Sequence, residues 1–194
     1  MKNLAWVVDG YNGKPYPWWK QCFFWDENKY ECQPKAIDFT CPTERSTEMS
    51  AFREIKGKCY YMTKVGCDNE HLGCTFQQAQ DQCKTVFGSG IGGIVFEPST
   101  LEINNAVLKA AEDVMDHSHW FWIGVTNDHP NEDFKYRSNS KPVSIKPIPF
   151  GSDQPYDPLP SSETRCIAAV SGTFKWFTPF CWKRFYTICE TSFV

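Results

Sequence analysis

The chain has 194 residues, 41% of them hydrophobic, and a formal net charge of −3. This length suits one domain with an extension and can bury a substantial core. The acidic balance excludes general binding to nucleic acids or anionic membranes, and no stretch reaches the ~18 apolar residues of a membrane span. Ten cysteines without Cys-x-x-Cys spacing indicate five disulfides and hence a secreted, extracellular protein, whose leader peptide is expected to be absent from this numbering.

Residues 1–40 form an aromatic-rich extension. Eight aromatic residues fall within residues 1–25, separated by turn signals such as Asp9-Gly10. The stretch from Cys22 to Cys32 is predicted to be a hairpin, closed by a bridge between its ends and with its tip at residues 26–28. The arm either packs on the main domain and hides its rings, or presents residues 1–25 for self-association or for a partner.

Two helices are predicted after residue 57. A strand-like run over residues 57–62 and a polar loop over residues 67–74 come first. Thr75 to Gln78 reads as a capping box, and the apolar positions Phe76, Ala79 and Cys83 then share one helical face. Glycines over residues 88–93 end this helix. A second capping box, Ser99 to Glu102, starts another helix, in which residues 101, 105, 108 and 112 follow helical spacing.

The remainder of the chain is predicted to be strands around one long loop. Six prolines within residues 142–160 exclude regular structure there, and long loops inside compact domains are usually functional or disordered. The order of strand, two helices and several strands indicates an α+β domain. The strand-like runs cover residues 120–125, 134–137, 165–170, 174–177 and 185–189, with a hairpin turn at Ser171-Gly172.

Residues 41–190 carry an ordered set of landmarks that resembles the long form of the C-type-lectin-like domain family. The set consists of Cys41-Pro42, Lys58-Cys59-Tyr60, the helix with Cys83, Trp122-Ile-Gly-Val125, Cys166, Trp176, Cys181 and Thr187-Ile-Cys-Glu190. The resemblance implies a disulfide-stapled α+β fold of two helices, antiparallel strands and a long loop over residues 41–194, preceded by the extension 1–40.

The resemblance also implies how the cysteines pair. It joins Cys83 to Cys189, Cys166 to Cys181, and Cys41 to Cys59. Two local pairs then remain, Cys22–Cys32 and Cys67–Cys74, so that all ten cysteines are used.

In sugar-binding members, a calcium ion is held by a Glu-Pro-Asn or Gln-Pro-Asp triplet, a later Glu and a Trp-Asn-Asp triplet. The first triplet matches Gln154-Pro155-Tyr156, followed by Asp157, and the resemblance is consistent with a cis bond before Pro155. Glu163 lies one residue out of step with the later Glu. The last triplet matches Trp176-Phe177-Thr178, which lacks the Asn and Asp ligands. Because Ca²⁺ needs six to eight oxygens, no cofactor is expected to be required at this sugar site.

Two further groups of residues carry weaker signals for a metal ion. The family's auxiliary calcium positions fall on Asn127, Asn131, Asp157 and Glu163, where two of the family's acids are replaced by amides. The alternative to a structural calcium ion is that Asn127, Asp128 and Asn131 form an Asx-type turn around Pro130. The segment from Asp116 to His119 places two imidazoles together but lacks a third ligand, which favours a solvated loop over a zinc site.

The sequence therefore predicts a recognition module and not an enzyme. It contains no Gly-x-Ser-x-Gly, His-Glu-x-x-His or phosphate-binding loop. The expected partner is an extracellular protein or glycan, bound without the usual calcium site. The alternatives are a self-assembling matrix, coat or fibre protein, and a calcium-dependent lectin. The residues expected to contact the ligand are Gln154, Tyr156, Asp157, Glu163, Lys175, Phe177 and Trp182.

Overall fold

The computed structural model divides the chain into two compact units, Met1–Phe39 and Thr40–Val194. In the first unit, β1 (Phe24–Asp26) and β2 (Glu31–Gln33) pair antiparallel, as expected for the predicted hairpin. The structure describes residues 24–26, 31–33, 39–42, 46–47, 49–68, 73–88, 91–115, 117–127, 133–155 and 164–191.

Two predictions about the extension stay predictions. Cys22 lies outside the described residues, and so do the side chains of residues 1–25. The Cys22–Cys32 bridge and the self-association of the arm are therefore not tested. The same is true of the division of roles between residues 1–40 and 41–194.

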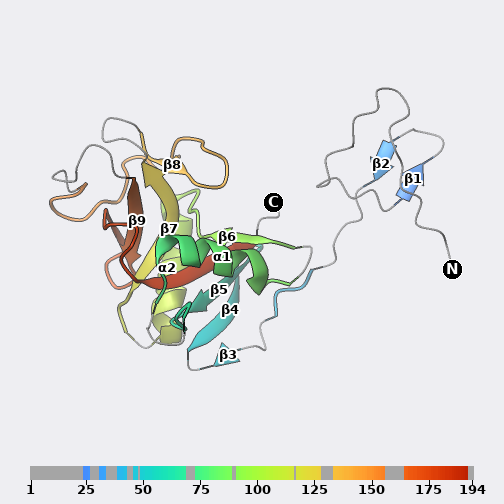
Figure 1. Cartoon of the computed structure of the whole chain (residues 1–194), viewed down its shortest axis with the longest axis horizontal. Coiled ribbons are helices and arrows are strands. Elements are labelled where there is room, and N and C mark those ends of the chain that lie inside the picture. The colour runs from blue at the N-terminus through green and yellow to red at the C-terminus, as the bar shows by residue number, and fades with distance from the viewer. Residues whose placement is uncertain are drawn as a thin grey trace. The chain divides into compact units, whose positions relative to one another are not determined.

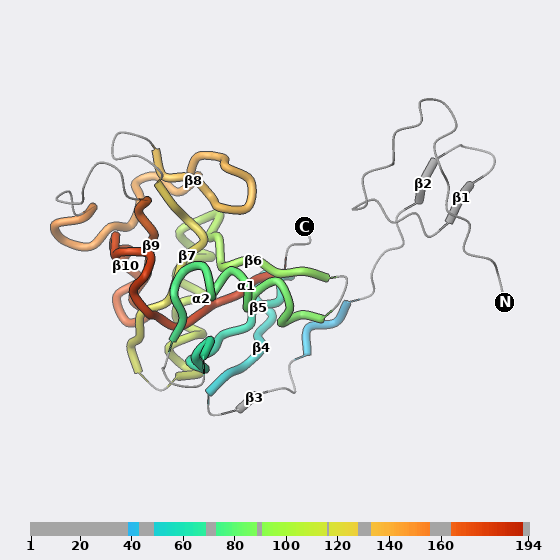
Figure 2. The backbone as a smooth tube through the Cα atoms, in the orientation of Figure 1, coloured from blue at the N-terminus to red at the C-terminus, as the bar shows by residue number. Residues whose placement is uncertain are grey.

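The second unit is built on one mixed sheet with the strand order β10-β9-β7-β11-β5-β4-β3 (Figure 1). Strand β6 also pairs with β11, and β8 with β7. The pairs are antiparallel except for β7 and β11, which run parallel. Figure 2 traces the described part of the loop after β8 in orange. The strands are β3 (Ser46–Thr47), β4 (Ser50–Ile55), β5 (Lys58–Thr63), β6 (Gly93–Val95), β7 (Trp120–Asn127), β8 (Lys135–Tyr136), β9 (Arg165–Val170), β10 (Lys175–Phe177) and β11 (Tyr186–Thr191).

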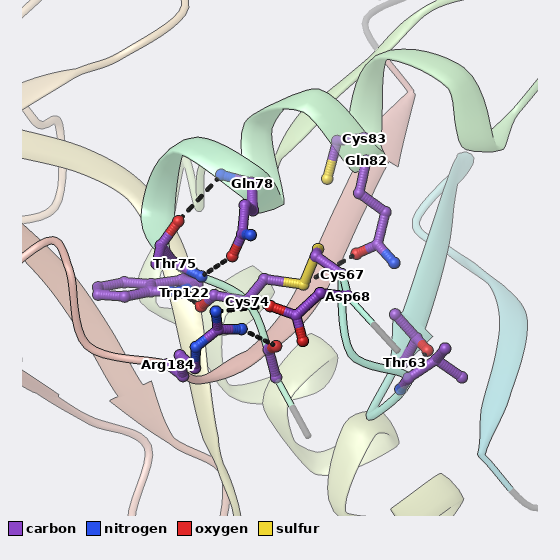
Figure 3. Close-up of a disulfide and its surroundings, with 12 residues drawn as sticks. Thr63, Cys67, Asp68, Cys74, Thr75, Gln78, Gln82, Cys83, Trp122 and Arg184 are labelled. Atoms are coloured by element: carbon purple, nitrogen blue, oxygen red, sulfur yellow. Dashed lines mark hydrogen bonds and ion pairs between the residues drawn. A yellow bond between two sulfur atoms is a disulfide. The ribbon is translucent and has the colours of Figure 1, made fainter. Parts of the chain in front are cut away.

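Helix α1 (Phe76–Val86) begins at the predicted capping box (Figure 3). The Thr75 hydroxyl accepts a hydrogen bond from Gln78 N, and the Gln78 side chain accepts one from Thr75 N. These bonds satisfy two amides that a helix start otherwise leaves without partners. The buried residues of α1 are those predicted, namely Phe76, Ala79 and Cys83.

Helix α2 (Leu101–Met115) corrects the prediction in two places. Thr100, and not Ser99, caps the helix, because the Thr100 hydroxyl accepts from Ile103 N at 3.1 Å. The Ser99 carbonyl instead accepts from the Ser144 hydroxyl. Leu101 is 48% exposed, so the predicted face is rotated. The buried face consists of Asn104, Val107, Leu108, Ala111 and Met115.

The two helices lie on opposite faces of the sheet. Side chains alternate along a strand, so neighbouring residues of β11 face opposite ways. Ile188 packs into the core cluster that contains the buried side chains of α2, whereas Cys189 is bridged to Cys83 in α1. On β7, Phe121 belongs to the α2 side and Trp122 contacts Phe76 of α1, with ring centroids 5.4 Å apart.

Four disulfides confirm the predicted pairing. Neither α1 nor α2, the helices of the part of the chain that the structure describes, is long and apolar enough to cross a membrane. Three strands, β3, β4 and β6, were not predicted from the sequence. The observed bridges are Cys41–Cys59, Cys67–Cys74, Cys83–Cys189 and Cys166–Cys181.

Candidate functional site

The loop that precedes β9 is fixed along strand β10. Gly151 N donates to the Trp176 carbonyl at 2.9 Å, and Trp176 N donates to the Pro149 carbonyl at the same distance. Trp176 is fully buried, so it anchors this backbone pairing to the core. The pairing brings Gln154 to the end of β10, next to Thr178. The two segments matched to the family's calcium triplets therefore meet in the structure.

Gln154 bonds to protein at the position where the family places a calcium ligand. Its Oε1 atom accepts hydrogen bonds from Thr178 N at 2.9 Å and from Thr178 Oγ1 at 2.8 Å. A carboxamide oxygen has two lone pairs, so these two donors occupy both. The peptide bond between Gln154 and Pro155 is cis. The oxygen offered by Gln154 is thus already satisfied within the protein.

Phe177 occupies the position of the missing Asn ligand with a hydrocarbon ring. A Cβ atom on Gly151 would lie 2.6 Å from a carbon of this ring, so the ring rests directly on the glycine backbone. On β7, the ring of Trp120 lies 4.8 Å from that of Phe177, centroid to centroid. The segment from Trp176 to Thr178 therefore carries two aromatic rings and a hydroxyl group, and no carboxylate or amide side chain.

The auxiliary calcium positions are only partly described. Asn127 ends β7 opposite Arg165 and is 2% exposed. Its three predicted companions, Asn131, Asp157 and Glu163, lie outside the described residues, as does Tyr156 of the sugar site. Among the residues that are described, no group of three or more His, Cys, Asp or Glu could hold a metal ion. A calcium ion at these positions stays a prediction.

Lys175 and Trp182 lie on the surface. Trp182 is 63% exposed, and its ring stacks on that of Phe180 with centroids 5.4 Å apart and planes 18° apart. The Lys183 ammonium lies 4.6 Å from the centroid of the Trp182 ring, within the range of a cation–π contact. The Cys166–Cys181 bridge ties this segment to β9. An exposed aromatic ring beside a cation suits contact with a protein or a glycan.

The fold agrees with a comparison to known protein families. The family model of the C-type lectin domain matches residues 73–191, more than half of the chain. The chain belongs to the C-type lectin domain family. A comparison with curated protein sequences gave no match.

Solved C-type lectin domains share the fold at low sequence identity. The C-type lectin CEL-I from Cucumaria echinata is 14% identical with a TM-score of 0.59, and the match covers 74% of this chain and 96% of that one. Human lithostathine is 20% identical with a TM-score of 0.57, over 72% and 95% of the two chains. The cow CD23 carbohydrate-recognition domain, solved in the presence of a GlcNAc2Man3 oligosaccharide, is 18% identical with a TM-score of 0.54, over 72% and 91%.

Some features of this C-type lectin domain were not predicted from its sequence. The bonding of Thr178 to Gln154 was missed, although both residues stand at triplet positions. The exposure of the Trp120 ring was missed too. The sequence predicts the strand that contains Trp120, but not which residues of that strand helix α1 covers. The ring of His119 packs against Tyr186 with centroids 4.9 Å apart, which fits the loop interpretation of this histidine better than zinc binding.

Proposed function

We propose that this protein is an extracellular recognition module that binds a protein or glycan ligand without calcium at the family's sugar position. The single observation that carries the proposal is the pair of hydrogen bonds from Thr178 to Gln154 Oε1. The disulfides support an extracellular location, because a reducing cytosol would keep these thiols free. The proposal assigns the protein a binding role and no reaction.

A calcium ion bound at Gln154 would break hydrogen bonds that the fold already makes. Calcium would have to displace both Thr178 donors from Gln154, and each such bond stabilises the fold by roughly 1 kcal/mol net. The ion would gain few ligands in return, since Phe177 offers no oxygen and Thr178 offers a neutral hydroxyl. A site with six to eight oxygens cannot be completed by these residues.

The proposed binding face consists of the long loop and the segment that follows β10. To this face we assign Gln154, Lys175, Phe177 and Trp182. Tyr156, Asp157 and Glu163 lie outside the described residues and stay predictions. The ring of Trp182 with the ammonium of Lys183 offers an aromatic surface and a positive charge side by side. Such pairs are enriched where proteins bind other molecules.

The test is calcium titration by calorimetry with a restored variant beside the wild type. The triple variant Tyr156→Asp, Phe177→Asn, Thr178→Asp recreates the family's triplets and should gain calcium binding that the wild type lacks. The variant Asn139→Asp, Ser152→Asp adds two carboxylates to exposed loop positions and should gain none. Strong calcium binding by the wild type, coupled to affinity for a monosaccharide, would overturn the proposal.

Ligand class is tested on an array of glycans and secreted proteins, read with calcium and with EDTA. The proposal expects the same signals in both conditions, because no ligand contact passes through the ion. Signals that disappear in EDTA would contradict it.

A further inference from the structure

Part of the sheet face that carries α1 is left uncovered by the helix. Trp120 and Trp122 alternate with Phe121 along β7, so both lie on this face. Phe76 contacts Trp122, which has no exposed surface. Helix α1 begins at Phe76, so no helical residue covers Trp120, which is 39% exposed. An aromatic ring is thus exposed where β7 begins.

Three rings on this face form one continuous apolar floor. Trp120 stacks on Phe185 with centroids 5.4 Å apart and planes 20° apart, and the Phe177 ring lies 4.8 Å from that of Trp120. Because Phe177 precedes Thr178, which bonds to Gln154, the floor continues into the proposed binding face. A hollow of about 230 Å³ opens beside the floor, smaller than the ~300–1,000 Å³ of sites for drug-sized ligands and suited to one side chain. Its lining consists of His119, Trp120, Arg184, Phe185 and Tyr186.

A rigid turn over residues 180–185 borders the floor. The bridge between Cys181 and Cys166 ties the turn to β9. At its end, Phe185 exchanges two backbone hydrogen bonds with Cys74, at 2.8 and 3.0 Å. A surface that is held in this way loses little conformational freedom when a ligand binds.

The charges of this part of the chain are all positive. Residues 165–189 contain four Lys and Arg residues and no Asp or Glu, although the whole chain has a net charge of −3. Lys175 pairs with Val170 in the sheet, and Val170 pairs with Trp120. Directly paired residues share a face, so Lys175 lies on the face of Trp120, with Cα atoms roughly 10 Å apart at about 4.8 Å per strand.

Two further cations stand on the turn. The Lys183 ammonium lies 4.6 Å from the centroid of the Trp182 ring. Arg184 forms an ion pair with Asp68, with Nη2 and Oδ2 2.6 Å apart (Figure 3). Within the part of the chain that the structure describes, no carboxylate forms an ion pair with Lys175 or Lys183. These two charges are left for a partner to balance.

Trp182 projects from the turn and does not line the hollow. The residue is 63% exposed, and its ring stacks on Phe180. Its indole N–H is a hydrogen-bond donor without acceptor capacity, as is the ammonium of Lys183 beside it. The complement of such a group is an acceptor with negative charge. Trp and Arg are also the residues that most often dominate the energy of protein–protein contacts.

We propose that this face binds an acidic segment of a partner protein, with carboxylates at Lys183 and the Trp182 N–H and one apolar side chain in the hollow. A polypeptide carries carboxylates and apolar side chains on one chain, which matches cations beside an apolar floor. A sulfated polysaccharide supplies negative charge but no apolar side chain for the hollow. The inference rests on the proposed function, because it names the ligand class of the same face.

The test begins with a phage-displayed library of random dodecapeptides, selected on the immobilised full chain in EDTA. The enriched peptides should contain more Asp and Glu than the starting library, together with an apolar residue. The most enriched peptide is then titrated with the full chain by fluorescence anisotropy, and heparin is titrated as a second probe. Raising NaCl from about 50 mM to about 500 mM should weaken peptide binding at least tenfold, because salt screens exposed charges.

Substitutions then place the peptide on this face. Trp182→Ala should weaken binding at least tenfold and Lys183→Gln about threefold, in line with the modest strength of an exposed ion pair. The matched controls are Leu101→Ala and Lys84→Gln, which change an exposed apolar side chain and an exposed cation on the two helices and should leave affinity unchanged. Equal urea midpoints for all four variants and the wild type confirm that the fold is retained.

Three results would overturn the inference. They are selected peptides no richer in Asp and Glu than the library, full affinity of Trp182→Ala for the peptide, or binding of heparin without binding of any selected peptide. In the third case the proposed function would stand, because the ligand would be a glycan bound without calcium. The calcium titration of the wild type tests the proposed function independently of these peptides.

Discussion

Glu190, in β11, places a carboxyl group in the interior of the domain. The residue is 2% exposed, and its Oε1 atom lies 3.4 Å from the Lys58 ammonium. Burial raises the pKa of Glu190 to about 7, and the charge of Glu97 adds to the increase, while Lys58 opposes it. Burial also raises the pKa of Glu97, whose carboxylate is bonded by the Ser138 amide and hydroxyl.

We expect the domain to lose stability as the pH rises from about 4.5 to about 7. In this window the folded chain keeps the Glu190 proton that the unfolded chain releases, so each step upward in pH favours unfolding. The shift of about 2.5 pKa units corresponds to at most about 3.5 kcal/mol, at roughly 1.4 kcal/mol per unit. Urea unfolding of the wild type and of Glu190→Gln across this range measures the effect as the difference between the two curves.

The control for this prediction is Glu102→Gln. Glu102 is on the surface, paired with Lys56 at 2.8 Å, and its pKa is lowered by that partner. This variant should retain the fall in stability between pH 4.5 and 7, whereas Glu190→Gln should flatten it. Parallel curves of unfolding free energy against pH for the wild type and Glu190→Gln would contradict a raised pKa of Glu190 in the folded chain.

At the scale of elements, the segment that leads into α1 is held against the start of β11. Gly73 has a φ of +84°, and a Cβ atom there would lie 2.9 Å from the Phe185 carbonyl oxygen. Gly73→Ala should therefore destabilise the domain through backbone strain, about 1–2 kcal/mol, plus the displacement of this segment. The matched control is Gly57→Ala, which has a similar φ of +77° but no atom within 4 Å. Equal shifts of the urea midpoint for the two variants would contradict the close approach.

Elements whose signals are local could be predicted, and elements defined by distant partners could not. The start of α1 depends on Thr75 and Gln78, which are three residues apart. Strand β6 has only three residues and is defined by pairing with Cys189 to Thr191, far along the chain, so no local pattern marks it. The start of α2 was missed by one residue because Ser99 and Thr100 can both cap a helix, and the contact of Ser144 with the Ser99 carbonyl is not local either.

The candidate site shows the same division. The family resemblance aligned Gln154 and Thr178 with calcium triplets, and the loss of ligands at Phe177 could be read from residue types alone. The bond between Gln154 and Thr178 depends on the backbone pairing along Trp176, which no sequence pattern specifies. Likewise, the alternation of β7 places Trp120 and Trp122 on one face, but only the position of α1 decides which of them is exposed.

At the scale of the whole molecule, one disulfide joins the first helix to the last strand. Cys83 and Cys189 are 106 residues apart in the sequence, and both are fully buried. The bridge therefore encloses most of the folded C-type lectin domain within one covalent loop. By contrast, Cys67 and Cys74 are only 7 residues apart in the sequence and close a short loop.

We expect removal of the long-range bridge to cost more stability than removal of the short one. In the chain-entropy model, a loop of about 100 residues contributes about 5 kcal/mol and a loop of 7 residues roughly 2–3 kcal/mol. The double variant Cys83→Ser, Cys189→Ser should therefore be secreted less and unfold at lower urea concentration than Cys67→Ser, Cys74→Ser. Replacing both cysteines of a pair avoids a reactive unpaired thiol in either protein. Equal secretion and equal unfolding midpoints would contradict the larger contribution of the Cys83–Cys189 bridge to stability.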